Sequence, residues 1–278
     1  MNSDFESTWR RRFEKFGREH ESDAGIAGWS EAGLQARLQD FLRSWHPDVA
    51  GALWLDAGCG AGTYARAMAS AGQQVIGLDY SVPSLLKARA RSAGGSVLWL
   101  AADVTRLPLA SSSCDGAICF GVLQALSDPE RAISELARVV RPGGRVRVDA
   151  LNANCLPDLL KRLLGKARGD EGRLRFDSPG RLKQVFRRHG FERIRIAWIP
   201  ILPGRFQAVQ RLVESGIARM LLANLPWIGS AVSHACVVAA ERSARSERAI
   251  PCPGSDVAKT NGAPFAPSPS NRGGSRVS

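Results

Sequence analysis

The sequence of 278 residues predicts an α/β fold, with a doubly wound, mostly parallel sheet that helices cover on both faces. Two observations favour this class. Short apolar runs alternate with segments of helical periodicity over much of the chain. A glycine-rich turn, with Gly58, Gly60 and Gly62 at every second position, follows the first apolar run and precedes a helix. Such a turn allows a ligand to lie against the backbone and the free N–H groups of the helix start, which predicts a nucleotide-type cofactor.

Two helices are expected before the first strand. They cover residues 1–22 and 30–44. In the first, Trp9, Phe13 and Phe16 recur at helical spacing between charged residues. This aromatic stripe either docks the helix on the body of the protein or forms part of a lid over cofactor and acceptor. Residues 1–45 are accordingly predicted to form an N-terminal helical cap.

Strands and helices then alternate up to residue 150. The expected strands cover residues 52–56, 74–79, 96–102, 115–121 and 145–150, and the expected helices cover 62–70, 82–92 and 129–139. Pro142-Gly143-Gly144 is expected to make a sharp turn into the fifth strand. This order predicts parallel strands joined by crossover helices.

The remainder of the chain is less regular. Helices are expected over residues 156–164, 178–188 and 206–224, and strands over 191–198 and 234–240. The main domain is predicted to cover residues 46–241, with substrate-side insertions expected at 151–177 and 200–230. Pro226 interrupts the apolar run 216–240, so no membrane span is expected. Residues 242–278 are rich in Ser, Pro, Gly, Ala and Arg without periodicity, which predicts a disordered tail.

The formal net charge is +12, and residues 161–195 hold 12 Lys or Arg against 4 Asp or Glu. Such a stretch is either a solvated basic face or a site for an anionic partner: a phosphorylated or carboxylated substrate, a membrane surface or nucleic acid. The 6 cysteines lack CxxC spacing, which favours buried thiols over disulfides or zinc, and no metal site is expected. The polar start of the chain argues against a secretory signal, so a cytoplasmic location is expected.

Two cofactor classes use a glycine-rich turn at this place. Dinucleotide folds place the third glycine three positions after the second, whereas here it comes two positions after. The spacing therefore disfavours a nicotinamide dehydrogenase. Asp56 precedes the turn, and Asp79 ends the second strand, where an acid suits ribose hydroxyls in either class.

Four stretches in register resemble the class I S-adenosylmethionine-dependent methyltransferases. They are Leu55–Gly62, Gly77–Ser81, Ala102–Pro108 and the two-part segment Cys114–Gln124 with Leu136–Gly144. Together they cover roughly residues 52–150. The segment Val122–Leu126 most resembles enzymes of quinone biosynthesis and secondary metabolism. The chain lacks the Asn/Asp-Pro-Pro-Tyr/Phe tetrapeptide of enzymes that methylate amino groups of nucleic acids. The resemblance implies a seven-stranded Rossmann-like sheet with an antiparallel last strand.

The resemblance also implies which residues bind S-adenosyl-L-methionine. These are Asp56, Gly58, Cys59, Gly60, Gly62, Asp79, Tyr80, Asp103, Val104, Leu107, Phe120 and Gly121. In the family's pattern Asp79 accepts from both ribose hydroxyls, Asp103 accepts from the adenine amino group, and the N–H of Val104 meets a ring nitrogen. Tyr80 and Leu107 would pack against the adenine. The glycine turn, with Phe120 and Gly121, would line the methionyl end.

Methyl transfer from a sulfonium is an in-line displacement, so the protein has chiefly to position the acceptor. A base is needed only if the acceptor loses a proton, and the candidates are His20, Gln124 and Asp149. Gln124 stands where many relatives hold a histidine, and glutamine cannot act as a base.

The expected acceptor is a small molecule, either anionic or uncharged, that is methylated at O, N or C. Arg173 and Arg175 could pair with a carboxylate or phosphate on it, and Asn152 is a further candidate for the pocket wall. The alternative is a protein of the same fold that acts on or binds RNA or a membrane-surface lipid through residues 161–195.

Overall fold

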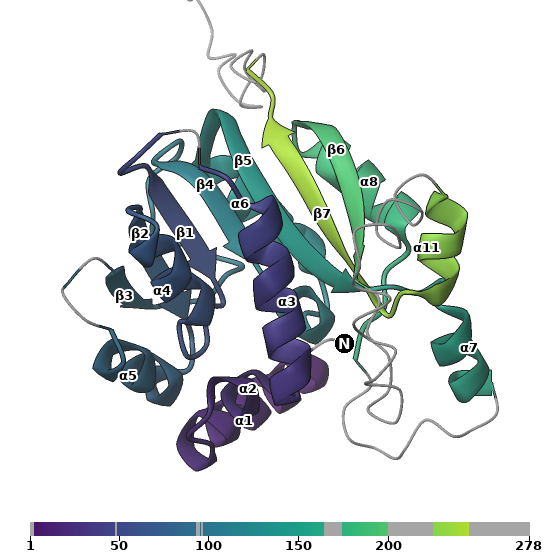
Figure 1. The fold of residues 1–278 in the computed structure, drawn as a ribbon, viewed down its shortest axis with the longest axis horizontal. Coiled ribbons are helices and arrows are strands. Elements are labelled where there is room, and N and C mark those ends of the chain that lie inside the picture. The colour runs from purple at the N-terminus through teal and green to yellow at the C-terminus, as the bar shows by residue number, and fades with distance from the viewer. Residues whose placement is uncertain are drawn as a thin grey trace, which may run out of the picture. The chain divides into compact units, whose positions relative to one another are not determined.

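The structure is a computed structural model that describes residues 3–47, 49–92, 95, 97–163, 174–199 and 225–244. Its strands are β1 (Leu53–Ala57), β2 (Gln74–Asp79), β3 (Val97–Ala101), β4 (Cys114–Cys119), β5 (Val140–Leu151), β6 (Phe191–Ile199) and β7 (Ala235–Arg242). They form one seven-stranded sheet in the order β3-β2-β1-β4-β5-β7-β6 (Figure 1). The first five strands pair in parallel, and β7 runs antiparallel to both of its neighbours. The predicted fold class is confirmed.

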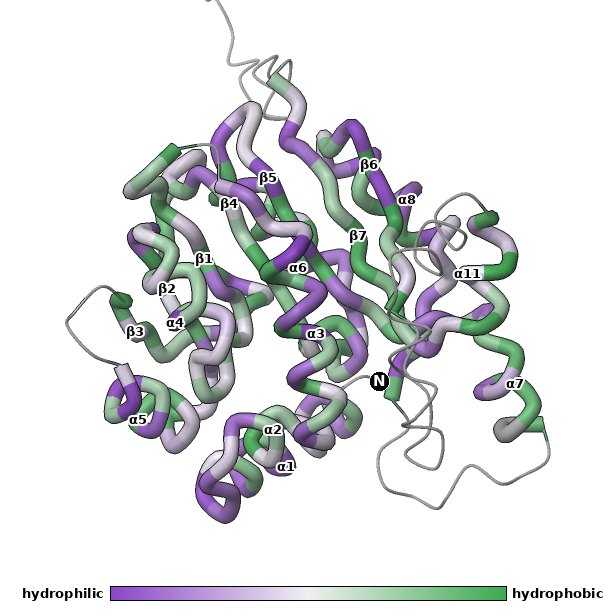
Figure 2. The backbone as a smooth tube through the Cα atoms, in the orientation of Figure 1, coloured by the Kyte–Doolittle hydropathy of each residue, from purple (hydrophilic) through white to green (hydrophobic). Residues whose placement is uncertain are grey.

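Helices cover both faces of this sheet. They are α1 (Ser3–Glu19), α2 (Asp23–Ala27), α3 (Glu31–Ser44), α4 (Thr63–Ser70), α5 (Val82–Ala90), α6 (Pro129–Val139), α7 (Leu156–Leu163), α8 (Pro179–Arg188) and α11 (Pro226–Val232), with a 3₁₀ turn, η1 (Leu123–Ala125). The face under α3 and α4 is largely aromatic, with Phe41, Trp45, Trp54 and Tyr64 in contact. The face under α6 and α8 is mainly aliphatic. Figure 2 shows apolar residues along most of β7, a strand paired on both sides.

The N-terminal region differs from the prediction by one helix. The first helix ends at Glu19, and the short helix α2 follows before α3. The Ser22 hydroxyl accepts from the N–H of Gly25 and so begins a new helix. The sequence signal was Ser22-Asp23, an N-cap followed by an acid in the first turn, which the aromatic periodicity of the preceding helix obscured.

The segment Pro142-Gly143-Gly144 is part of β5, so the prediction of a sharp turn is wrong. Pairing with β4 shifts register at this point, from Cys114–Val140 to Gly116–Arg145. A Cβ on Gly144 would lie 2.6 Å from the carbonyl oxygen of Asp115. The glycines therefore let one strand pass an irregularity rather than reverse the chain.

Several predictions lie wholly or partly outside the described residues. They concern the helix at 206–224, the insertions at 151–177 and 200–230, and the tail beyond residue 244. The division at 46–241 stays a prediction; the chain separates by its contacts into residues 1–246 and 247–278, and β7 ends at Arg242. Among the described residues, no helix is long and apolar enough to cross a membrane. The five described cysteines are buried free thiols.

Candidate functional site

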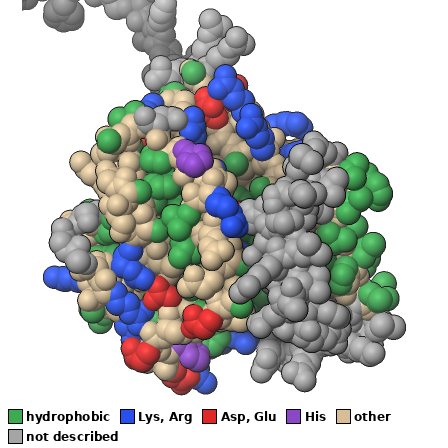
Figure 3. Space-filling view, in the orientation of Figure 1, with side chains coloured by type: hydrophobic (Ala, Val, Ile, Leu, Met, Phe, Trp, Pro, Cys, Tyr) green, Lys and Arg blue, Asp and Glu red, His purple; other side chains and the backbone are tan. Residues whose placement is uncertain are grey.

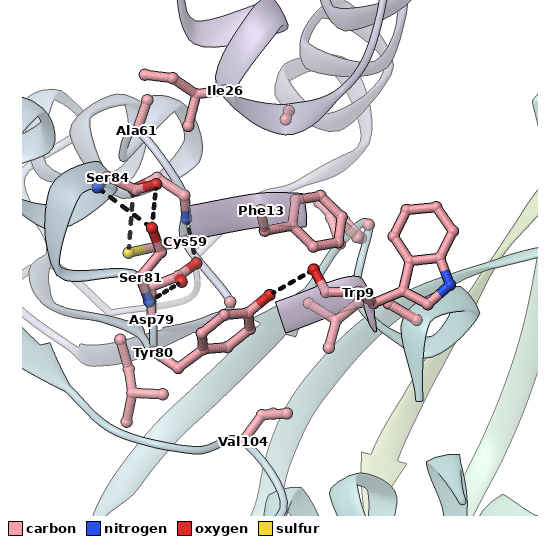
Figure 4. Close-up of a pocket in the computed structure, with 18 of the residues that line it drawn as sticks. Trp9, Phe13, Ile26, Cys59, Ala61, Asp79, Tyr80, Ser81, Ser84 and Val104 are labelled. Atoms are coloured by element: carbon pink, nitrogen blue, oxygen red, sulfur yellow. Dashed lines mark hydrogen bonds between the residues drawn. The ribbon is translucent and has the colours of Figure 1, made fainter. Parts of the chain in front are cut away.

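A pocket of about 990 Å³, open solvent at its mouth included, lies at the carboxyl edge of the parallel strands. Because β3, β2, β1 and β4 are neighbours in that order, the loops that follow them line up along this edge. Each loop contributes to the pocket wall, and α1, α2 and α3 supply the opposite wall. Figure 4 shows this arrangement, with Asp79 and Tyr80 on one side and Trp9 and Phe13 across from them.

The three glycines of the turn have different tasks. A Cβ on Gly58 would lie 2.2 Å from Val122, and one on Gly62 would lie 2.3 Å from Trp99. Both glycines therefore allow close packing inside the protein. A Cβ on Gly60 would meet no neighbour closer than 4.0 Å, because this residue faces the pocket. Gly58, Cys59 and Gly60 line the pocket, whereas Gly62 lies behind it.

The carboxylate of Asp79 joins two of the loops. One oxygen accepts from the N–H of Gly60 at 2.8 Å and the other from the N–H of Ser81 at 2.8 Å. Burial raises the pKa of Asp79 above its usual range. Each carboxylate oxygen has a further lone pair, so Asp79 can accept additional hydrogen bonds from a ligand in the pocket.

Asp56 supports the turn from below. It is buried, and one of its oxygens accepts from the N–H of Ala65 in the first turn of α4 at 3.0 Å. Desolvation raises the pKa of this carboxyl to about 7. Asp56 is not among the residues that line the pocket, and the cofactor contact that the resemblance implies for it stays a prediction.

Asp103 marks the end of the pocket beside β3. Its carboxylate accepts from the N–H and the hydroxyl of Thr105, and it forms an ion pair with Arg10 of α1. The Arg10 guanidinium also lies over the ring of Tyr80, 5.1 Å from its centroid. Val104 lines the same end. Leu107, in contrast, is buried in the aliphatic core and is not among the residues that line the pocket, and its contact with the adenine stays a prediction.

Helix α1 is docked on the body and also forms part of the pocket wall. Trp9 and Phe13 line the pocket, and the Tyr80 hydroxyl bonds to the carbonyl of Trp9 at 3.5 Å. A Cβ on Gly17 would lie 2.5 Å from the Ser84 hydroxyl, so α1 sits closely on the start of α5. Helix α1 therefore packs on the body and also contributes to the pocket wall, so docking and a place over the pocket do not exclude each other.

Ion pairs join the link between α1 and α2 to the body. Asp23 pairs with Arg66 and Arg91, and Glu21 pairs with Lys87 and Arg91. Figure 3 shows side chains of both charge signs gathered near α1, α2 and α5. Asp23 also lines the pocket, so its charge is balanced by two arginines behind the wall.

Phe120 and Gly121 line the pocket beyond β4. The N–H of Gly121 donates to Asp149 at 2.6 Å, and the other oxygen of Asp149 accepts from Arg37 at 2.9 Å. Arg37 stacks under the ring of Trp29 at 4.5 Å. Asp149, proposed as a base, is thus the buried partner of an arginine, and burial raises its pKa despite that arginine.

The other catalytic candidates also lie outside the pocket lining. His20 is exposed, with its ring centroid 5.4 Å from that of Phe16. Gln124 is buried, and its side-chain oxygen has no hydrogen-bond partner. The amide of Asn152 donates to the carbonyls of Ser230 and Ser233. The described lining therefore brings none of these candidates together.

Of the two arginines proposed to hold an anionic acceptor, Arg175 bonds to Asp177 and to the carbonyl of Ser127. Arg173 lies outside the described residues. Arg37 was missed altogether. The available signal was an arginine on the buried face of a helix, between Leu34 and Phe41.

The sheet order, the antiparallel β7 and the pocket over the glycine turn define the S-adenosylmethionine-dependent methyltransferase fold. In agreement, a family described as "Methyltransferase domain" matches residues 55–148. Residues 55–148 are therefore similar to this family, and the described chain has the fold of these enzymes.

Individual relatives match over part of their length. A malonyl-[acyl-carrier protein] O-methyltransferase of Pseudescherichia vulneris is 38% identical over 130 residues, 47% of this chain and 51% of the relative. A demethylmenaquinone methyltransferase of Clavibacter sepedonicus is 40% identical over 100 residues, 35% of this chain and 40% of the relative. The chain thus spans about half or less of the curated relatives that it matches.

Among solved structures, magnesium protoporphyrin IX methyltransferase of Synechocystis PCC 6803 with bound SAH has a TM-score of 0.55. Its sequence identity is 18%, and the match covers 87% of this chain and 97% of the other. At this identity the similarity supports the fold alone.

Proposed function

We propose that this protein transfers a methyl group from S-adenosyl-L-methionine to O, N or C of a small-molecule acceptor. The observation that carries the proposal is the row of Gly60, Asp79 and Asp103 along one pocket at the carboxyl edge of the sheet. The cofactor is an amino acid joined to a nucleoside. A backbone without a side chain, a carboxylate with spare lone pairs and, one strand further on, a second carboxylate are suited to such a molecule.

The residues present fit this cofactor. Gly60 has no side chain to fill the pocket, Asp79 would hold the ribose, and Asp103 with Val104 would hold the adenine. Phe120 and Gly121 would line the methionyl end. Bound there, the cofactor supplies a methyl group that a positive sulfur already activates.

The protein's part is then to orient the acceptor and exclude water. Trp9 and Phe13 of α1 line one side of the pocket. At the other end, the hydrogen bond from the N–H of Gly121 to Asp149 fixes the wall. Positioning of this kind contributes up to roughly 7–11 kcal/mol in well-aligned reactions. A base is needed only if the acceptor loses a proton, and the described lining offers carboxylates but no histidine or lysine for that role.

The acceptor class is the open part of this proposal. The relatives carry names that refer to a malonyl thioester and to a quinone, the first a carboxylate and the second uncharged. The comparisons give no preference to the alternative of an RNA or lipid-surface protein, and part of residues 161–195 lies outside the described chain.

Calorimetry with S-adenosylhomocysteine and with NADH tests the cofactor. We expect S-adenosylhomocysteine to bind and NADH not to bind. If NADH alone bound, the methyltransferase proposal would be overturned.

A further inference from the structure

The two ends of the pocket differ in chemistry. Asp103 and Ser81 follow β3 and β2, whereas Val122 and Leu126 follow β4 at the opposite end of the row of loops. The proposed function assigns the nucleoside to the first end, and the inference below rests on that assignment. The methionyl part of the cofactor would lie at Phe120 and Gly121 beside β4, so the acceptor has to lie next to it, against the residues that follow these two and those of α2 and α3.

Apolar side chains form this second end. They come from α2, α3 and the segment around η1: Ile26, Ala27, Trp29, Leu34, Val122 and Leu126. Ile26, Leu34 and Leu126 are buried in the free protein, and Trp29 is partly buried. An apolar molecule at this end would therefore remove from water chiefly the surface of Ala27, Trp29 and Val122, which are only partly buried.

Trp29 is fixed in place from two sides. A Cβ on Gly121 would lie 3.0 Å from the indole, so ring and backbone are in close contact. Arg37, on α3, lies 4.5 Å from the centroid of the Trp29 ring and donates a hydrogen bond to Asp149. The indole therefore presents a fixed flat surface, while the buried arginine is engaged with a carboxylate.

The charges around the pocket disfavour an anion. Of the four carboxylates in the described lining, Asp23 is paired with Arg66 and Arg91, and Asp103 with Arg10. The other two, Glu6 and Asp79, accept hydrogen bonds from uncharged groups. Glu6 accepts from the N–H and the hydroxyl of Ser127, just beyond η1, and so lies at the acceptor end. A second negative charge near the half-buried Glu6 would lose part of its hydration and meet repulsion.

We infer that the acceptor is an uncharged molecule with a flat apolar body that lies against Trp29 and Val122. These side chains select the body, and Glu6 selects against a carboxylate. A quinol-like or phenolic acceptor satisfies both conditions, whereas a malonyl carboxylate does not.

Size-matched probes test the inference on protein saturated with S-adenosylhomocysteine. At neutral pH 2-naphthol is uncharged and 2-naphthoate is an anion of similar shape. By calorimetry we expect 2-naphthol to bind at least about tenfold more tightly. Equal or tighter binding of 2-naphthoate, or no binding of 2-naphthol, would overturn the inference. Failure to bind S-adenosylhomocysteine would instead overturn the proposed function.

Two variants locate the selection. Glu6→Gln keeps the shape and removes the charge, so it should tighten 2-naphthoate by about threefold or more and leave 2-naphthol unchanged. Ala125→Arg places a cation in the lining and should tighten 2-naphthoate relative to 2-naphthol by about tenfold. Ala125→Met is its matched control, with added bulk and no charge, and should leave the ratio of the two affinities unchanged. An unchanged ratio in both charge variants, with S-adenosylhomocysteine still bound, would refute the role of charge.

Discussion

Removing the carboxylate of Asp79 is the most direct perturbation of the proposed cofactor site. In Asp79→Ala the N–H groups of Gly60 and Ser81 lose their acceptor, and a bound ribose would lose both of its contacts. Hydrogen bonds to a charged group contribute about 1.5–3 kcal/mol each. Loss of two such contacts costs roughly 3 kcal/mol or more, which corresponds to at least about a 100-fold rise in the Kd of S-adenosylhomocysteine.

The free energy of unfolding of Asp79→Ala should fall by less than its free energy of S-adenosylhomocysteine binding. The two backbone N–H groups lie next to the pocket, where water can replace the lost acceptor. The carboxylate that is removed was also costly to bury, because desolvation raises its pKa. We therefore expect urea unfolding to show a loss of at most about 2 kcal/mol.

Asp115→Ala is a matched control at the opposite edge of the sheet. Asp115 also accepts from a backbone N–H, that of Leu53 at 2.8 Å, and from Arg141 at 2.6 Å. This variant should lose stability and retain its affinity for S-adenosylhomocysteine. The reasoning is refuted if calorimetry gives the same Kd for Asp79→Ala and the wild type, or if both variants lose affinity equally.

Three further predictions concern the support of the site. The pKa of Asp56 rises from 3.8 to about 7 on folding, so the native state binds more protons between these pH values, and the contribution of this group to the free energy of unfolding falls by up to about 4 kcal/mol as the pH rises through that window. Asp56→Asn should therefore reduce the difference in unfolding free energy between pH 5 and pH 8, measured with urea. An unchanged difference would contradict the assignment to Asp56. Gly17→Ala should weaken S-adenosylhomocysteine binding severalfold, since the new Cβ would lie 2.5 Å from the Ser84 hydroxyl. The double variant with Ser84→Gly should recover part of the affinity, because the Ser81 hydroxyl at 2.9 Å and the Ser84 nitrogen at 3.0 Å still crowd the new Cβ; an affinity equal to the wild type in Gly17→Ala would refute the contact. Arg37→Met leaves Asp149 buried without its ion pair and should cost about 3–5 kcal/mol in urea unfolding, most of it recovered by adding Asp149→Asn; a loss below 1 kcal/mol would show that the pair is not needed.

Local sequence patterns were sufficient for the elements of the parallel half of the sheet. The strands at β1 and β2 and the helix α6 lie close to their predicted bounds, because alternating apolar runs and the N-terminal signal Asp128-Pro129 act within a few residues. Where two local signals competed, the prediction was less accurate. The aromatic periodicity of α1 obscured the new start at Ser22, and the glycines at 143–144 indicated a turn where a bulge exists.

The candidate site depends more on contacts between distant residues. Asp149 was predicted as a lining residue or base, but Arg37, which is 112 positions away in the sequence, makes it the partner in a buried ion pair. Leu107 was predicted beside the adenine, and the tertiary structure places it in the aliphatic core and not among the lining residues. Arg10 reaches Asp103 across 93 positions and could not be inferred from the sequence around either residue.

The sequence by itself determined the fold class and the glycine turn with Asp79, because backbone conformation and strand ends are encoded by neighbouring residues. The tertiary structure decided which of the three glycines faces a ligand, which carboxylates line the pocket and which carboxylate holds Arg37. It also placed Trp29 and Glu6 at the end beside β4, where we infer the choice of acceptor is made. These features arise when α1 to α3 pack over the edge of a sheet formed later in the chain, so no local pattern specifies them.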